Sequence, residues 1–111
     1  MADVQIVINR EGPLPVSATF RAMGDGPAVV MLSGSVWTED QDTQIGVSLS
    51  VDGTPIGSAW IFANNSNTHM AIVPIVIPYK FSAGEHTISL NALTGETEAD
   101  QNDYFMVSIL Y

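Results

Sequence analysis

The sequence predicts an all-β protein, a single domain (residues 1–111) of eight antiparallel strands wound as a jelly-roll sandwich. No segment repeats its apolar residues at helical spacing between capping residues. Short apolar runs are instead cut by Gly, Pro, Asn and Asp about every 10 to 15 residues, which is typical of a sandwich or a barrel. A chain of 111 residues can form one core but hardly two. Eight antiparallel strands most often wind as a jelly roll of two sheets.

The first four strands are recognised by the alternation of their apolar residues, because successive side chains of a strand point to opposite faces. Val16–Ala22 and Gln44–Val51 alternate strictly, so we expect each to bury one face and expose the other. Ala28–Trp37 is apolar on both faces in its first half. In chain order the four strands are Asp3–Asn9, Val16–Ala22, Ala28–Trp37 and Gln44–Val51.

A hairpin is predicted at Asp52-Gly53, because a two-residue type I′ turn needs positive φ at both central residues and Asp-Gly tolerates it. The turn should pair Gln44–Val51 with a fifth strand over Pro55–Phe62. Trp60 and Phe62 share one face of that strand.

The longest apolar run, Met70–Ile77, is interrupted only by Pro74 and predicts the sixth strand. It is too short to span a bilayer, which takes about 20 apolar residues as a helix, so no membrane insertion is expected. Both of its faces are apolar. One face can enter the core, and the other must be covered by something else.

The last two strands are expected at Glu85–Leu93 and Tyr104–Tyr111. Jelly-roll connectivity then puts strands one, eight, three and six in one sheet, and strands two, seven, four and five in the other. The strands that are apolar on both faces all fall in the first of these sheets. This distribution is expected when a jelly roll oligomerises through one sheet.

The chain is acidic, with a formal net charge of −9 and only Arg10, Arg21 and Lys80 as cations. Nucleic acid and anionic membranes are therefore poor candidates for partners, because both need clustered positive charge. Cysteine is absent, which excludes disulfides and thiolate metal sites. The N-terminus lacks a basic stretch followed by an apolar one, so no signal peptide is expected. The localisation stays unknown, with a virion or an extracellular assembly as the expectation.

Four segments resemble the trimeric jelly rolls of the tumour necrosis factor and complement globular-head superfamily (TNF-like), most closely its bacterial and phage members. They are Val29–Trp37, VDGTPIGSAWIF, FSAGEHTISL and the terminal NDYFMVSILY. The resemblance implies a homotrimer that packs through the sheet containing both termini.

We assign the two faces of that sheet from their side chains. The aliphatic face is expected in the core, and the face with Met and Tyr is expected at the trimer interface, because these residues suit interfaces. The expected core face is Val4, Ile6, Ile8, Val30, Leu32, Val36, Val73, Ile75 and Ile77. The expected interface is Gln5, Val7, Val29, Met31, Met70, Ile72, Tyr104, Met106 and Leu110.

Two acidic loops offer hard oxygen ligands of the kind that Ca²⁺ prefers. If the loops meet at one end of the sandwich, Asp40, Asp42, Asp100 and Asp103 could share a calcium ion. The alternative is that the acidic residues only keep the domain soluble. His69 and His86 do not have the spacing of a histidine metal site and are expected to be ordinary strand histidines.

No nucleophile elbow, phosphate-binding loop or paired-carboxylate motif is present, so no catalytic residue and no cofactor other than Ca²⁺ is predicted. The preferred interpretation is a non-enzymatic trimeric binding or structural module of a phage or bacterial surface or appendage. The alternative is a carbohydrate-binding lectin, in which aromatic side chains stack on a glycan of the host surface or another source. An enzyme of unknown type is a weaker alternative. The candidate stacking residues are Trp37, Trp60, Tyr79 and Tyr104.

Overall fold

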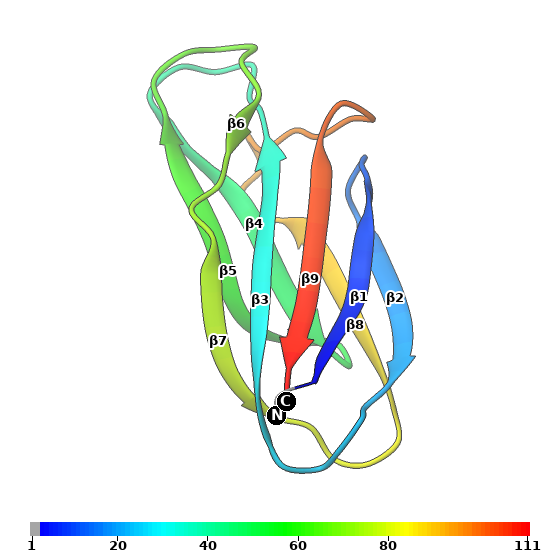
Figure 1. Ribbon diagram of the computed structural model, residues 1–111. Helices are drawn as coiled ribbons and strands as arrows, with labels where there is room; N and C mark the ends of the chain where they lie inside the picture. Colours follow the sequence, from blue (N-terminus) through cyan, green and yellow to red (C-terminus); the bar gives the residue numbers. More distant parts are fainter. Residues whose placement is uncertain (1–2) are drawn as a thin grey trace.

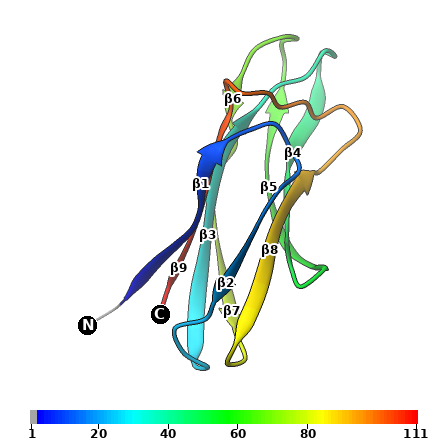
Figure 2. The ribbon, with the colours of Figure 1, turned by 90° about the vertical axis from the view of Figure 1, so that its right-hand side faces the viewer.

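A computed structural model describes residues 3–111 of the chain. Two antiparallel sheets pack face to face as a β-sandwich, and the described residues form no helix (Figures 1 and 2). The strands of residues 3–111 are β1 (Val4–Glu11), β2 (Val16–Arg21), β3 (Pro27–Val36), β4 (Thr43–Val51), β5 (Thr54–Ala63), β6 (Met70–Ala71), β7 (Ile75–Lys80), β8 (Glu85–Ala92) and β9 (Tyr104–Leu110).

The two sheets contain the strands that jelly-roll connectivity predicts. One sheet has the order β1–β9–β3–β6, with β7 also paired to β3, and the other has the order β2–β8–β4–β5. The beginning of β1 and the end of β9 lie at the same end of the sandwich (Figure 2), where the Tyr111 N–H donates to the Asp3 carbonyl at 2.9 Å. No helix among residues 3–111 is long and apolar enough to cross a membrane.

The predicted sixth strand is divided into β6 and β7, which raises the number of strands from the expected eight to nine in residues 3–111. Pro74 lies between the two strands, and a proline has no N–H to give to a sheet ladder. β6 pairs with the end of β3 and β7 with its beginning. Between them, the Val73 N–H donates to the Trp60 carbonyl of β5 at 3.3 Å, so this segment closes one side of the sandwich.

The core lies between the sheets and is formed by alternate residues of the long strands. Phe105, Val107 and Ile109 of β9 are fully buried, which leaves Tyr104, Met106 and Leu110 on the outer side, as expected for this strand. β3 contributes three of the residues that were assigned to the core. These are Val30, Leu32 and Val36, which are at most 1% exposed.

The predicted hairpin is confirmed. Asp52 and Gly53 have φ of 50° and 85°, and Val51 pairs with Thr54 across a two-residue turn. Further along, the ladder shifts by one residue: Ser50 pairs with Pro55, but Leu49 pairs with Gly57. One extra residue of β5, Ile56, is therefore accommodated as a β-bulge.

A second bulge lies in β1, and it makes part of the face assignment wrong. Ile6 pairs with Ser108 while Ile8 pairs with Val107, so Val7 is the extra residue. A one-residue shift moves side chains to the opposite face. Val4 and Ile6 were expected in the core but are 57% and 58% exposed. Gln5 turns toward the second sheet instead, where its amide donates to the Arg21 carbonyl at 3.1 Å.

Three further assignments also differ from expectation. Val73 is 59% exposed, because it lies in the irregular segment between β6 and β7. Ile72 was placed at the trimer interface but is 2% exposed and belongs to the core. Met70 pairs with the inward-facing Val36 and packs against the same core, so it is not an outer residue either. Ile75 and Ile77 are half-buried against the core.

Candidate functional site

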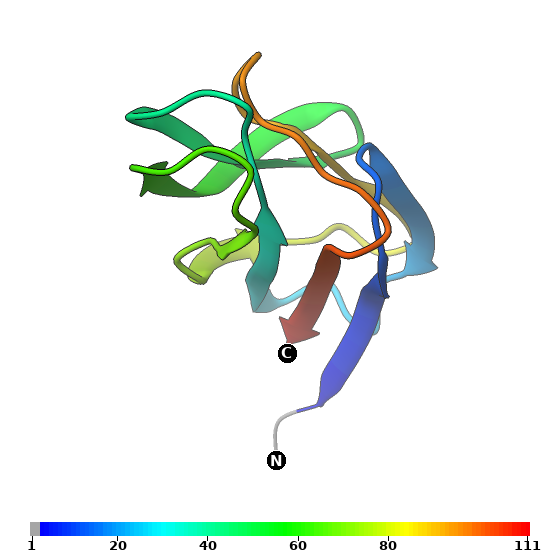
Figure 3. The same cartoon turned by 90° about the horizontal axis from the view of Figure 1, so that it is seen from above.

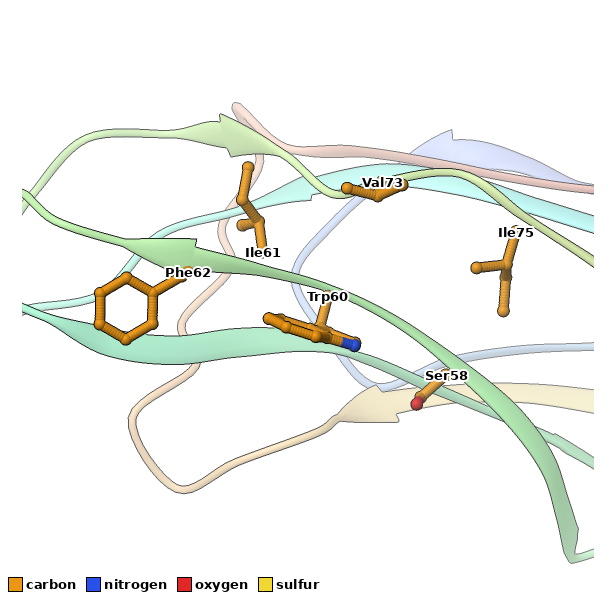
Figure 4. Close-up of a pocket in the computed structure, with 6 residues that line it drawn as sticks. All are labelled: Ser58, Trp60, Ile61, Phe62, Val73 and Ile75. Atoms are coloured by element: carbon orange, nitrogen blue, oxygen red, sulfur yellow. The ribbon is translucent and has the colours of Figure 1, made fainter.

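An apolar groove runs along the side of the sandwich where β5 meets the segment between β6 and β7 (Figure 4). Its volume is about 290 Å³. Trp60 and Phe62 come from β5 and are 47% and 49% exposed. The lining residues are Ser58, Trp60, Ile61, Phe62, Val73 and Ile75.

The bulge at Ile56 is what turns the two aromatic rings outward. Beyond the bulge, Ile45 of β4 pairs with Ile61 and Gly46 pairs with Trp60. Ile45 is fully buried, so its partner Ile61 faces inward and Trp60 faces the opposite side. If Ile56 paired regularly with Leu49 instead, continued pairing from the turn would place Trp60 opposite Ile45 and inside the core.

Gly46 is the residue that lets Trp60 lie where it does. A Cβ added to Gly46 would lie 2.7 Å from the Trp60 Cβ, closer than side chains can approach. The Gly46 backbone is also held from the other direction, because its N–H donates to the Thr97 hydroxyl at 3.1 Å and its carbonyl accepts from the Leu93 N–H at 2.9 Å. The strand segment that carries Trp60 is therefore paired with a firmly held part of β4.

The groove is chemically simple. None of its lining side chains is charged, and the polar groups they bring are the Ser58 hydroxyl and the Trp60 indole N–H. Val73 and Ile75 form the wall opposite the two rings. Such a surface can pack against flat, largely apolar faces of a ligand and can offer it few hydrogen bonds.

A second group of polar side chains lies at the end of the sandwich where the β3–β4, β5–β6 and β8–β9 loops meet (Figure 3). His69 Nδ1 lies 2.7 Å from Asp103 Oδ1. The Asp103 carboxylate is fully buried, and it also accepts from the Ser35 hydroxyl at 2.8 Å and from the Asp100 N–H at 2.9 Å. The hydrogen bond to Asp103 raises the pKa of His69.

This group contains half of the predicted calcium ligands. Atoms of His69, Asp100 and Asp103 lie within 4.8 Å of one another, whereas Asp40 and Asp42 are exposed and outside the group. Ca²⁺ takes about 6–8 oxygen ligands. Asp103 already accepts three hydrogen bonds and His69 offers nitrogen, so Asp100 is the carboxylate left to an ion. Any calcium site would need Asp40, Asp42 or backbone carbonyls in addition.

His86 has a structural environment. Nδ1 lies 2.6 Å from Asp52 Oδ2 and Nε2 lies 2.7 Å from the Ser82 carbonyl. A carboxylate and a carbonyl both accept, so this arrangement stabilises the imidazolium form, in which each ring nitrogen carries a proton. The hydrogen bond to Asp52 raises the pKa of His86, and the same bond lowers the pKa of Asp52. The ring thereby ties the β4–β5 turn to β8.

The four candidate stacking residues do not lie together in the structure. Trp37 is half-buried beside His69, and Tyr79 is half-buried against Phe81. Tyr104 is 46% exposed on the outer side of β9, where its hydroxyl donates to Asn9. Trp60 alone of the four lines the groove. Phe62 was not among the predicted stacking residues, although its position two residues after Trp60 puts both on one face of a strand.

The sequence matches no protein-family model and no curated protein. The fold, in contrast, is similar to several solved structures. Latent PorU from Porphyromonas gingivalis matches with a TM-score of 0.63 and 13% identity over 98% of this chain, which spans only 12% of that protein. The CBM36-1 domain of a multidomain xylanase from the hindgut metagenome of Trinervitermes trinervoides matches with a TM-score of 0.57 and 17% identity, over 98% of this chain and 97% of that domain.

The C-terminal domain of EclA, described as a sugar-binding protein, has a TM-score of 0.52 and 17% identity over 98% of this chain and 76% of that one. At such low identities the similarity concerns the fold alone. The protein is a jelly-roll β-sandwich of the kind found in carbohydrate-binding modules.

Proposed function

We propose that the protein is a non-enzymatic carbohydrate-binding module that binds a neutral glycan in the groove beside β5. The observation that carries the proposal is the pair of exposed rings, Trp60 and Phe62, side by side along one wall of an apolar groove. An exposed tryptophan is costly to leave in water, and aromatic side chains on a rigid strand give large contact areas at little entropic cost. The fold shared with a CBM36 domain and with a sugar-binding domain supports the proposal.

The negative charge of the chain restricts the class of glycan that the groove can bind. The net charge is −9, and no cation lines the groove that could attract a carboxylate or a sulfate group. Sialylated, uronic and sulfated glycans should therefore be disfavoured. Neutral sugars whose rings present a flat C–H face fit the two aromatic side chains, with the Ser58 hydroxyl and the Trp60 indole N–H available for hydrogen bonds.

A glycan array tests this proposal. The wild-type protein should bind neutral oligosaccharides and no acidic ones, and Trp60→Ala should abolish the signal. Tyr104→Ala is the matched control, because Tyr104 is an aromatic residue of equal exposure outside the groove (46% against 47% for Trp60). An array signal that survives Trp60→Ala, or that is confined to anionic glycans, would contradict the assignment.

A TNF-like homotrimer in a phage or bacterial surface appendage is the second candidate function, and it remains a prediction. The observation that favours some form of assembly is the apolar outer side of the sheet containing β1, β9, β3 and β7, with Val4, Ile6 and Val76 each more than half exposed. The mass in solution tests the trimer, because it must be three times the 11.9 kDa of one chain.

A further inference from the structure

We infer that a second copy of this chain docks on the outer side of the β1–β9–β3–β7 sheet and forms a two-fold pair. The surface concerned, hereafter the outer face, is built from six apolar side chains that alternate with core residues. They are Val4, Ile6, Met31, Val76, Met106 and Leu110.

Three aliphatic side chains of the outer face are more than half exposed. Val4, Ile6 and Val76 are 57%, 58% and 63% exposed. Between Met31, Val76 and Met106 the surface is hollowed by about 270 Å³. Contiguous apolar patches of this kind mark interaction sites on soluble proteins. Methionine side chains are flexible, so the two at the centre can adapt to an opposing surface.

Charge identifies the partner as a second copy. The central strands β3 and β9 contain no charged residue, although the chain carries 12 acidic residues. Alternation along the edge strands puts Lys80 of β7 and Glu11 of β1 on this side. Lys80 ends β7 and Glu11 ends β1, at opposite corners of the sheet (Figure 1). A face with one cation, one anion and an apolar centre is complementary to itself, as a two-fold interface requires.

The positions of Lys80 and Glu11 also determine how the two copies are oriented relative to each other. A two-fold axis in the plane of the interface, perpendicular to the line from Lys80 to Glu11, brings Lys80 of each copy opposite Glu11 of its partner. By the pairing register the two residues lie roughly 27 Å apart along the strands and roughly 14 Å apart across them, so the strands of the two sheets would cross at roughly 55°.

The size of the outer face sets the strength of the pair. Four strands about 4.8 Å apart, each with about seven residues of about 3.4 Å, cover roughly 450 Å² per copy. Roughly 900 Å² in total lies below the range of stable interfaces, so the pair should be reversible and depend on concentration. Trp60 and Phe62 lie on β5 of the other sheet and no residue of the outer face lines the groove, so the inference does not depend on the proposed function.

Sedimentation equilibrium over a wide range of protein concentration tests the inference. The wild-type mass should rise from 11.9 kDa toward twice that value. Met31→Glu with Met106→Glu should remain monomeric at every concentration, because two new charges would be buried without partners. Val76→Lys, at a 63% exposed position that the monomer tolerates, should weaken pairing as well. The control is Ser17→Glu with Asn91→Glu, which adds the same charge to exposed positions of the other sheet and should pair like the wild type.

A charge exchange tests the two-fold arrangement itself. Lys80→Glu and Glu11→Lys should each weaken pairing, and the double variant should restore it. Circular dichroism at low concentration confirms that each variant is folded. A wild type that stays monomeric at millimolar concentration, a limiting mass of three chains, or a double variant that fails to pair would overturn the inference.

Discussion

Both ring nitrogens of His86 face acceptors, and this single side chain joins two elements that are far apart in the sequence. Asp52 accepts from its Nδ1, while the other Asp52 oxygen accepts from the Thr87 N–H at 2.9 Å. Phe20 and Phe81 pack against the imidazole ring. Because the ring is buried and charged, its protonation is linked to the stability of the fold.

The stability of the protein should fall as the pH rises above neutrality. The folded-state pKa of His86 is raised above its ordinary value of 6.5, and that of His69 is raised as well. The stabilisation that these residues give is complete below about pH 6.5 and is lost as the pH rises through the raised pKa. Melting temperatures between pH 6 and pH 9 check this expectation.

Single variants separate the two histidines. His86→Gln should melt below the wild type at pH 6 and lose less stability between pH 6 and pH 9. His69→Gln should retain the share of the pH dependence that belongs to His86. In acid, Asp52 makes the free energy of unfolding depend on pH with the opposite sign. Its pKa is lowered from 3.8 in the folded protein, so the stabilisation it gives is lost only as the pH falls through that lowered pKa. A wild-type stability that is flat from pH 6 to pH 9 would contradict the charged state of His86.

Gly53→Val should destabilise the protein by about 1–3 kcal/mol, because a β-branched side chain is strained at positive φ. Gly53 has φ of 85°. Thr54→Val is the control, since Thr54 is an exposed strand residue next to the turn. Urea unfolding of both variants measures the difference, and equal midpoints for Gly53→Val and the wild type would disprove the strain.

At the scale of elements, the positions of strands and their sheets could be predicted, but the direction of several side chains could not. Alternation of apolar residues marks strands because it reflects burial of one face. The bulges at Val7 and Ile56 each add one residue. No glycine or proline flanks Val7, whereas Pro55 and Gly57 flank Ile56, and both residue types are often found at bulges.

Each bulge reverses the faces on one side of it, so the exposure of Val4 and Ile6 and the groove were not predicted. Met31, Met106 and Leu110, away from the β1 bulge, were placed on the correct side of the sheet. The contact between His69 and Asp103 joins residues 34 apart, which pattern analysis cannot pair.

Deleting Ile56 tests the bulge directly. Ser50–Pro55 and Leu49–Gly57 would become neighbouring pairs of one regular ladder, so Trp60 should stay opposite Gly46 and outside the core. The deletion variant should therefore fold, and its Trp60 should remain accessible to a fluorescence quencher. Deleting Gly24, a loop residue with no neighbour within 4 Å of an added Cβ, is the matched control. Loss of folding, or burial of Trp60, would show that the strand does not keep its register without this residue.

At the scale of the whole molecule, the sandwich separates its surfaces by sheet and by end. The outer face belongs to one sheet, the groove lies between the edge strand β5 of the other sheet and the β6–β7 segment, and His69, Asp100 and Asp103 lie together at one end. This arrangement would let the protein pair through one side and bind a glycan on another, so that a pair presents two grooves. Two linked sites raise the apparent affinity for a repetitive glycan without new contacts.

Calcium binding by the acidic loops at the end of the sandwich remains a prediction. Millimolar Ca²⁺ should raise the melting temperature by reducing repulsion among the loop carboxylates, and Asp100→Asn should remove most of the shift. The carboxylates concerned are Asp40, Asp42, Asp100 and Asp103. If Mg²⁺ or NaCl gives an equal shift, the effect is charge screening and no site exists.

The most direct test of the account is an NMR titration of the indole N–H groups with a neutral oligosaccharide that binds on the array. The protein has two tryptophans, Trp37 and Trp60, so two indole signals are expected. On addition of the oligosaccharide, the Trp60 signal should shift and saturate, together with the backbone signals of Phe62 and Val73. The Trp37 signal should stay in place. Saturable shifts at Trp37 and the loops around His69, with none at Trp60, would contradict it and move the glycan site to the end of the sandwich.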